Sequence, residues 1–247
     1  MNPEQWLPVG LTLFFSGLLQ STAGFGFGLL ALPLLLMQGF SLVQAATFTI
    51  IGSGMHRVMA VTHLRRAVNW KELLPMIGVG LCALPLGLFL MASLSSMAQS
   101  QVRQIIGGTI LVVLLVQWFS KIEPREKVHR AWGFVAAFFA GILNGMANIG
   151  GPPIVLWILA HKWHNEKFRV TALAFSITFV PFQIASMTGI FGSSVLLNAA
   201  RCLVFFPIIL LGGWLGLKVG WSIDIKYLRL LARLLLLIIA LVSIFRN

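Results

Sequence analysis

Ten residues near the middle of the chain, 144–153, decide its fold, and they read NGMANIGGPP. Two adjacent glycines followed by two prolines cannot continue a regular helix, because glycine disfavours the helix and proline lacks an N–H and clashes with the preceding turn. A related stretch, GFGFGLLALP, lies at residues 24–33. Both stretches interrupt apolar sequence, so we predict one helix break in each half of the chain.

The apolar segments beside these breaks are short. They cover residues 6–20 and 29–37 in the first half, and residues 131–144 and 154–160 in the second half. An upright crossing of a bilayer needs about 20 apolar residues. Each pair therefore forms either a re-entrant hairpin or a broken, tilted helix pair. Irregular backbone at that depth is stable only where protein or a watery cavity covers it.

The composition places the whole chain in a membrane. Of 247 residues, 58% are hydrophobic and 10% are charged, and the mean hydropathy is +0.93. Soluble domains carry about 25% charged residues, and a single soluble core of this size could not bury so many apolar side chains. We predict an all-α polytopic membrane protein, surrounded by the lipid bilayer, with no sizeable soluble domain.

The order of segments predicts an internal repeat. Residues 16–20 match residues 140–144 in residue type at a spacing of 124, which also places Gly26 on Gly150. Each half has one broken pair followed by three spans, and an odd number of crossings turns the second half upside down. We predict two inverted membrane repeats, residues 1–120 and 131–247, joined by a cytoplasmic linker at residues 121–130. The six spans cover residues 41–60, 73–92, 102–119, 168–190, 198–217 and 227–245.

The charges predict an orientation. The chain has 18 Lys and Arg residues against 6 Asp and Glu residues, a net charge of +12. A nucleic-acid partner is the alternative explanation, but no basic run carries interleaved aromatic residues. If the linker is cytoplasmic, all the basic residues except Arg103, Arg201 and Arg246 fall on the cytoplasmic side, as the positive-inside rule requires. We therefore expect a bacterial-type inner membrane, with both termini on its non-cytoplasmic side.

The two breaks predict a binding site for a small anion. Inverted repeats built around discontinuous helices are typical of transporters that bind substrate near the midplane. A half-helix that begins after a glycine turn presents free backbone N–H groups and the positive end of its dipole. Glycine packing between helices is the alternative explanation. The candidate substrate-binding residues are Gln20, Ser21, Gly24, Gly26, Gly28, Asn144, Asn148, Gly150, Gly151 and Pro152.

The positions of the charged residues support an anionic or neutral substrate. Each of the six acids falls at a terminus, in a loop or at a segment edge, whereas a cation transporter usually keeps an intramembrane carboxylate. Arg57 and Arg201 are candidates for an access route for anions, and His56 is a candidate for proton coupling. The alternatives are that Arg201 reaches outward to the membrane surface and that His56 lies at the interface.

The chain carries no motif that predicts an enzyme, a cofactor or a metal site. Cys82 and Cys202 lie in apolar stretches, and His161 and His164 have no evident third ligand. Serines and histidines occur without a carboxylate partner close in the sequence.

At its two breaks the chain resembles the TauE/SafE family, also called the 4-toluene sulfonate uptake permease family. Residues 24–33 and 141–153 carry the resemblance, and the segment count and length fit along the whole chain. One departure is that residues 24–28 lack a longer run of adjacent glycines, so Phe25 and Phe27 are candidates to narrow or gate a cavity.

The resemblance implies a secondary transporter of small anions such as sulfite, organosulfonates or related organic acids, acting as an exporter or an importer. A passive anion channel and a non-transporting membrane scaffold are the alternatives. The oligomeric state stays open, with a homodimer as one option.

Overall fold

The structure is a computed structural model, and it describes residues 3–64, 68–120, 124–126, 128–163, 165–222 and 225–245. Over these residues the chain is helical and contains no strand, which confirms the predicted all-α class. The elements are η1 (Pro3–Gln5), α1 (Trp6–Ala23), α2 (Phe27–Met37), α3 (Leu42–Leu64), α4 (Trp70–Ser95), α5 (Gln99–Phe119), α6 (Arg130–Ala147), α7 (Gly151–Leu159), α8 (Asn165–Ile177), α9 (Phe179–Phe191), α10 (Ser194–Leu203), α11 (Phe206–Ser222) and α12 (Ile225–Phe245).

Several helices have the length and composition of membrane spans. Within the described residues, α4, α5, α6 and the segment Val170–Phe191 meet both criteria. A fifth span results if α10 and α11, which bend by 58° at their junction, are counted as one. The chain is therefore a multi-pass membrane protein by its helices.

Two segments that the sequence predicted as continuous contain breaks. Residues 168–190 divide between α8 and α9, and residues 198–217 divide between α10 and α11. Each first helix ends four residues before a proline, at Ile177 before Pro181 and at Leu203 before Pro207. A proline ring clashes with the carbonyl four residues earlier, which accounts for both ends.

The closest helix packing joins one half of the chain to the other. On α4 and α6, a Cβ atom on Gly87 or Gly141 would overlap backbone atoms of the opposite helix. The same holds between α1 and α11 at Gly212 and Gly216. Small residues let backbones approach closely where lipid removes the usual hydrophobic drive between helices. α1 and α6 are the first helices of the two predicted halves. Each of them packs against a helix of the other half, α1 against α11 and α6 against α4, so the halves interlock.

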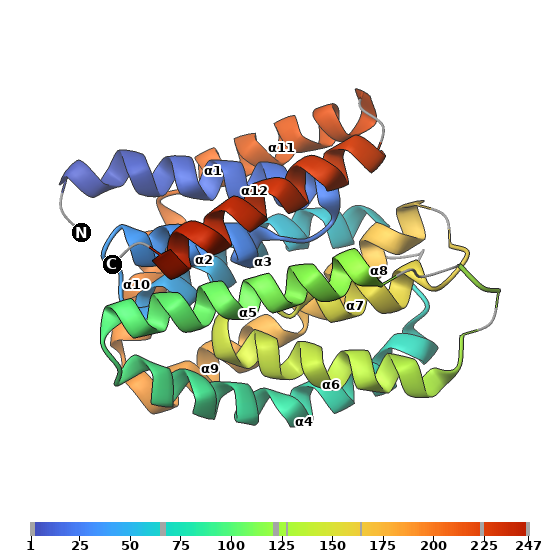
Figure 1. The fold of residues 1–247 in the computed structure, drawn as a ribbon, viewed down its shortest axis with the longest axis horizontal. Coiled ribbons are helices and arrows are strands. Elements are labelled where there is room, and N and C mark those ends of the chain that lie inside the picture. The colour runs from blue at the N-terminus through green and yellow to red at the C-terminus, as the bar shows by residue number, and fades with distance from the viewer. Residues whose placement is uncertain are drawn as a thin grey trace.

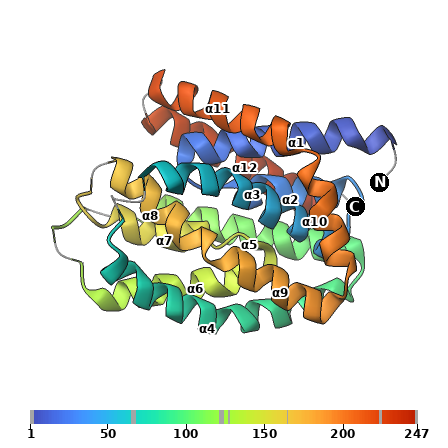
Figure 2. The same cartoon turned by 180° about the vertical axis from the view of Figure 1, so that it is seen from behind.

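The helix directions bear on the predicted repeat. In Figure 1 the two termini lie at the same end, α1 runs away from that end, and α6 runs back toward it. Figure 2 shows the same arrangement from behind. Such opposed directions are what an inverted repeat requires; the symmetry itself, with its linker and its boundaries, stays a prediction.

The half-helix α2 lies in the interior. Nine of its eleven residues are buried, from Phe27 to Leu36. A helix that is apolar all round and covered on every side needs no amphipathic face. Protein thus shields the irregular backbone before α2. Such shielding is required of irregular backbone that lies within a membrane, because lipid offers its polar groups no hydrogen-bond partner.

Candidate functional site

The first break forms because two glycines adopt left-handed backbone conformations. Gly24 (φ 82°) ends α1, and its N–H donates to the carbonyl of Gln20 over 2.8 Å. Gly26 (φ 107°) precedes α2. The first helical hydrogen bond of α2 runs from the N–H of Leu30 to the carbonyl of Gly26 at 3.0 Å. The N–H groups of residues 27–29 therefore precede any acceptor within their own helix.

The second break repeats this geometry with different residues. Asn148 (φ 55°) ends α6, and its N–H donates to the carbonyl of Asn144 over 2.8 Å. The side-chain oxygen of Asn144 accepts a hydrogen bond from the N–H of Gly150 at 3.2 Å. Because Pro152 and Pro153 have no N–H, the first turn of α7 offers fewer donors than that of α2.

The two breaks meet at the centre of the molecule. A Cβ atom on Gly28 would overlap the carbonyl oxygen of Asn148, and a Cβ atom on Gly151 would lie 3.3 Å from that of Phe25. Glycine at position 28 is therefore required by close approach of the backbones. The half-helices α2 and α7 begin beside the same small space.

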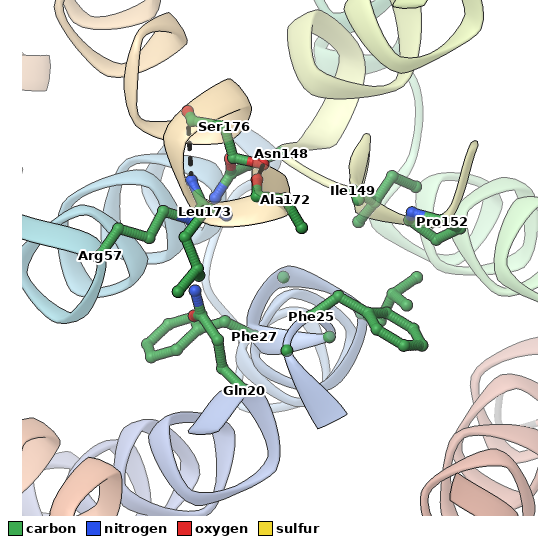
Figure 3. A pocket seen from close by; sticks show the side chains of 15 residues that line it. Gln20, Phe25, Phe27, Arg57, Asn148, Ile149, Pro152, Ala172, Leu173 and Ser176 are labelled. Atoms are coloured by element: carbon green, nitrogen blue, oxygen red, sulfur yellow. Dashed lines mark hydrogen bonds between the residues drawn. The ribbon is translucent and has the colours of Figure 1, made fainter. Parts of the chain in front are cut away.

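That space is a cavity, and helices α3 and α8 complete its wall (Figure 3). It offers about 20 Å³ to the centre of a water-sized sphere, which is room for roughly one water molecule. In this conformation it is nearly closed to an anion the size of sulfite. Its lining comprises Gln20, Gly24, Phe25, Gly26, Phe27, Gly28, Leu29, Arg57, Asn148, Ile149, Gly151, Pro152, Ala172, Leu173 and Ser176.

Arg57, on α3, is the cation in that lining. Its side chain is 8% exposed, and its Nη1 donates to the carbonyl oxygen of Ser176 on α8 over 3.5 Å. Its Nε is buried and has no hydrogen-bond partner. In the described part of the chain, no carboxylate lies within 4 Å of the guanidinium. A buried cation without a counter-charge is costly, so the site favours an anion.

Two amide side chains complete the polar part of the cavity. The Asn148 amide nitrogen donates to the Ser53 hydroxyl at 3.2 Å, which leaves its Oδ1 without a partner. The Oε1 of Gln20 is also buried and without a partner. Figure 3 shows Arg57 and Asn148 beside Ser176, with Gln20 facing them from α1.

Four further residues predicted at the site lie behind this wall. Ser21 and His56 share a hydrogen bond between Oγ and Nε2, and a Cβ atom on Gly213 of α11 would overlap the histidine ring. Asn144 caps the second break, as described above. A Cβ atom on Gly150 would overlap the carbonyl of Ala140, so this glycine allows α7 to begin against α6. All four support the cavity without lining it.

Arg201 lies apart from the cavity. It is exposed near the end of α10 and lines a separate hollow of about 250 Å³ with Gln5, Gln44 and Asn198. This hollow lies at the end of the molecule that carries the termini. The structure therefore does not bring Arg201 to the two breaks.

The sequence reasoning missed Ser53, Ser176 and Gln183. Ser53 and Ser176 contact Asn148 and Arg57, and the amide of Gln183 donates to the carbonyl of Asn144 over 2.6 Å. None of them lies near either of the two glycine-containing breaks in the sequence. Polar residues inside otherwise apolar helices were the available signal.

Comparison with known proteins now gives the family. The family model described as sulfite exporter TauE/SafE matches residues 9–243. The chain belongs to the TauE/SafE family. A relative in this family, named "Probable sulfite/organosulfonate exporter TauE" from Cupriavidus necator, is 23% identical over 203 residues, or 80% of this chain and 77% of that protein. No solved structure matches. Membership confirms the resemblance seen in the sequence and supports a role in membrane transport.

Proposed function

We propose that this TauE/SafE family member is a secondary transporter that carries sulfite, organosulfonates or related small organic acids by alternating access. The name of the relative from Cupriavidus necator supports sulfur-containing anions as the substrate class. Transport, not catalysis, is the role that both the family and the cavity support.

One observation carries this proposal: Arg57 is a buried cation that faces the beginnings of two half-helices and has no carboxylate partner among the described residues. A bound anion would supply the missing counter-charge. The free N–H groups of residues 27–29 and the positive helix end would act on the same anion. The amide N–H groups of Gln20 and the second N–H of the Asn148 amide would donate to its oxygen atoms.

Selectivity follows from the same groups. A guanidinium presents a planar fork of donors that matches the paired oxygens of sulfite, sulfonate and carboxylate groups. A cation would meet Arg57 and two positive helix ends, and no acid of the described part of the chain lines the cavity to offset them. The site is therefore suited to small oxyanions.

Transport requires the cavity to open alternately to each side. Room for about one water molecule is too little for sulfite, so binding must widen the gap between the breaks. The hollow around Arg201 is a candidate for the outer approach. His56, on α3, hydrogen-bonds to Ser21 on α1 and packs against Gly213 on α11, so any proton coupling through it would act on helix packing and not directly on the anion.

The first test is flux in proteoliposomes of sulfite and of methanesulfonate, with and without a pH gradient. We expect saturable flux in the parent protein. Arg57→Gln should slow it at least tenfold, because a hydrogen bond to a charged group contributes about 1.5–3 kcal/mol. Arg103→Gln, which changes a half-buried arginine outside the cavity, is the matched control and should transport normally.

Other outcomes would favour the other functions. Single-channel currents would identify a passive pore, and no flux of any small anion from folded protein would favour a scaffold. Unchanged flux in Arg57→Gln would remove the site assignment. Residence in a bacterial-type inner membrane and outward termini are part of the proposal, and the oligomeric state stays open, with a homodimer as one option.

A further inference from the structure

A long groove opens on the outside of the helix bundle between α5 and α6, with α7 as its floor. Its volume is about 1190 Å³, above the roughly 300–1,000 Å³ of ordinary small-molecule pockets. Its walls are apolar and face outward: Val112 and Val116 on α5 and Phe139 on α6 are 59%, 49% and 54% exposed. In a membrane protein, such a surface faces lipid.

The groove has the depth of one leaflet. Along α5 its lining runs from Thr109 to Ser120, which at 1.5 Å per residue is about 16 Å. Half of a hydrocarbon core of about 30 Å is about 15 Å. One end of the groove therefore lies near the midplane of the bilayer, and the other lies at the membrane surface.

The surface end is polar and basic. Arg125, His129 and Trp132 line it there. The backbone of Arg125 is held at the end of α7, because its N–H donates to the carbonyl of Ala160 over 2.8 Å and its carbonyl accepts from the N–H of Lys162 at 3.2 Å. These bonds fix the backbone from which the exposed Arg125 side chain extends at this end of the groove.

The equivalent gap in the other half is filled by protein. There α12 packs against both α1 and α2. On this side α5 packs along α2 and α12 and touches α7, but among the described residues it has no comparable packing against α6. Under the predicted repeat, the counterparts of α5 and α6 are α12 and α1, which pack together, whereas α5 and α6 leave the groove open between them.

We infer that this groove binds an anionic phospholipid from the leaflet at the linker end, with an acyl chain between α5 and α6 and the phosphate on Arg125 and His129. The apolar walls match the chain, and the basic rim matches the phosphate. A small hydrophilic anion has no polar path along valine and phenylalanine side chains, so the groove is not the substrate route.

The lipid would touch the transport machinery. Pro152, in the first turn of α7, lines both the groove and the central cavity. An acyl chain in the groove would press on the half-helix that begins at the second break. The binding itself does not depend on the proposed transport function.

The test measures lipid retained by purified, delipidated full-length protein after incubation with phosphatidylglycerol or phosphatidylcholine, using native mass spectrometry. We expect preferential retention of phosphatidylglycerol. Arg125→Gln should weaken it about fivefold, the loss expected for one basic group at an anionic surface. Lys71→Gln, another exposed basic residue outside the groove, is the control and should bind as the parent does.

A second pair of variants tests the groove itself. Val112→Trp should abolish retention by filling the groove, whereas Leu86→Trp, at a similarly exposed position on α4 (52% against 59%), should not. Val116→Trp replaces Val112→Trp if that variant does not fold. Equal retention of both lipids, or normal retention in the groove variants, would overturn the inference. A third outcome would also overturn it. If the parent protein is a dimer and Val112→Trp is a monomer, the groove is a subunit interface and not a lipid site.

Discussion

At the scale of single residues, the site depends on backbone conformations that only certain side chains permit. Gly24 and Asn148 hold equivalent places at the two breaks, and both have a positive φ. Asparagine is among the few residues with a side chain that adopt this conformation readily. The second break can therefore end its helix as a glycine would and still bring an amide to the cavity.

This suggests a clean test of the amide of Asn148. Asn148→Gly keeps the left-handed conformation and removes the side chain, whereas a leucine there would add about 1–2 kcal/mol of backbone strain. We expect Asn148→Gly to reduce sulfite flux in proteoliposomes about tenfold, with the melting temperature in detergent close to that of the parent. Normal flux would show that the amide does not contact the substrate.

The importance of the planar guanidinium at position 57, as distinct from its charge, can be tested in the same way. Arg57→Lys keeps the positive charge but loses the planar fork. We expect flux between that of the parent and that of Arg57→Gln, with a raised apparent KM for sulfite and methanesulfonate. If Arg57→Lys and Arg57→Gln behave alike, geometry matters more than charge.

At the scale of elements, the half-helices owe their positions to the tight helix pairs around them. The α4–α6 pair holds the second break, and the α1–α11 pair holds the first. Both pairs rely on glycines whose missing side chains let the backbones touch. The tight packing of these helix pairs therefore positions the break residues that α1 and α6 carry.

Two glycines of α4 provide a matched pair for this argument. A Cβ atom on Gly87 would overlap the carbonyl of Ile142 on α6, whereas one on Gly78 would have nothing within 4 Å. We expect Gly87→Ala to destabilise the fold by about 1–3 kcal/mol, as overpacking does. Gly78→Ala should be neutral or slightly stabilising. Thermal unfolding in detergent, followed by circular dichroism, measures both, and equal melting temperatures would contradict the argument.

At the scale of the whole molecule, the helices α3, α5, α7 and α11 end at one side of the bundle, and the termini lie at the other (Figures 1 and 2). Described basic residues near the first end include Lys71, Arg125 and Lys162, and those toward the other end include Arg103 and Arg201. Among the described residues, basic side chains are therefore more frequent at the first end than at the end that carries the termini.

The predicted orientation follows from this gathering of charge. In a bacterial inner membrane, alkaline phosphatase fused after the last residue should be active, and green fluorescent protein fused there should be dark. Fusions after Glu126, in the linker, should give the opposite result. A fluorescent fusion at the C-terminus would reverse the proposed orientation.

The sequence by itself determined the helical class, the membrane setting and the two breaks, because hydropathy and Gly-Pro chemistry act locally. It also named most of the cavity lining, since the residues around Gly26 and Asn148 are neighbours in the chain. The sequence did not distinguish residues that line the cavity from residues that support it. Only the packing of the helices placed Ser21 and His56 behind the cavity wall and Arg201 at a separate hollow.

The contribution of α3 and α8 to the cavity was likewise decided by tertiary structure. Arg57 and Ser176 are separated by 119 positions and meet because their helices cross beside the breaks. Such long-range contacts depend on how helices pack, which hydropathy does not encode. The interlocking of the two halves and the unfilled groove between α5 and α6 have the same origin, since each depends on which helices touch and not on which residues are apolar.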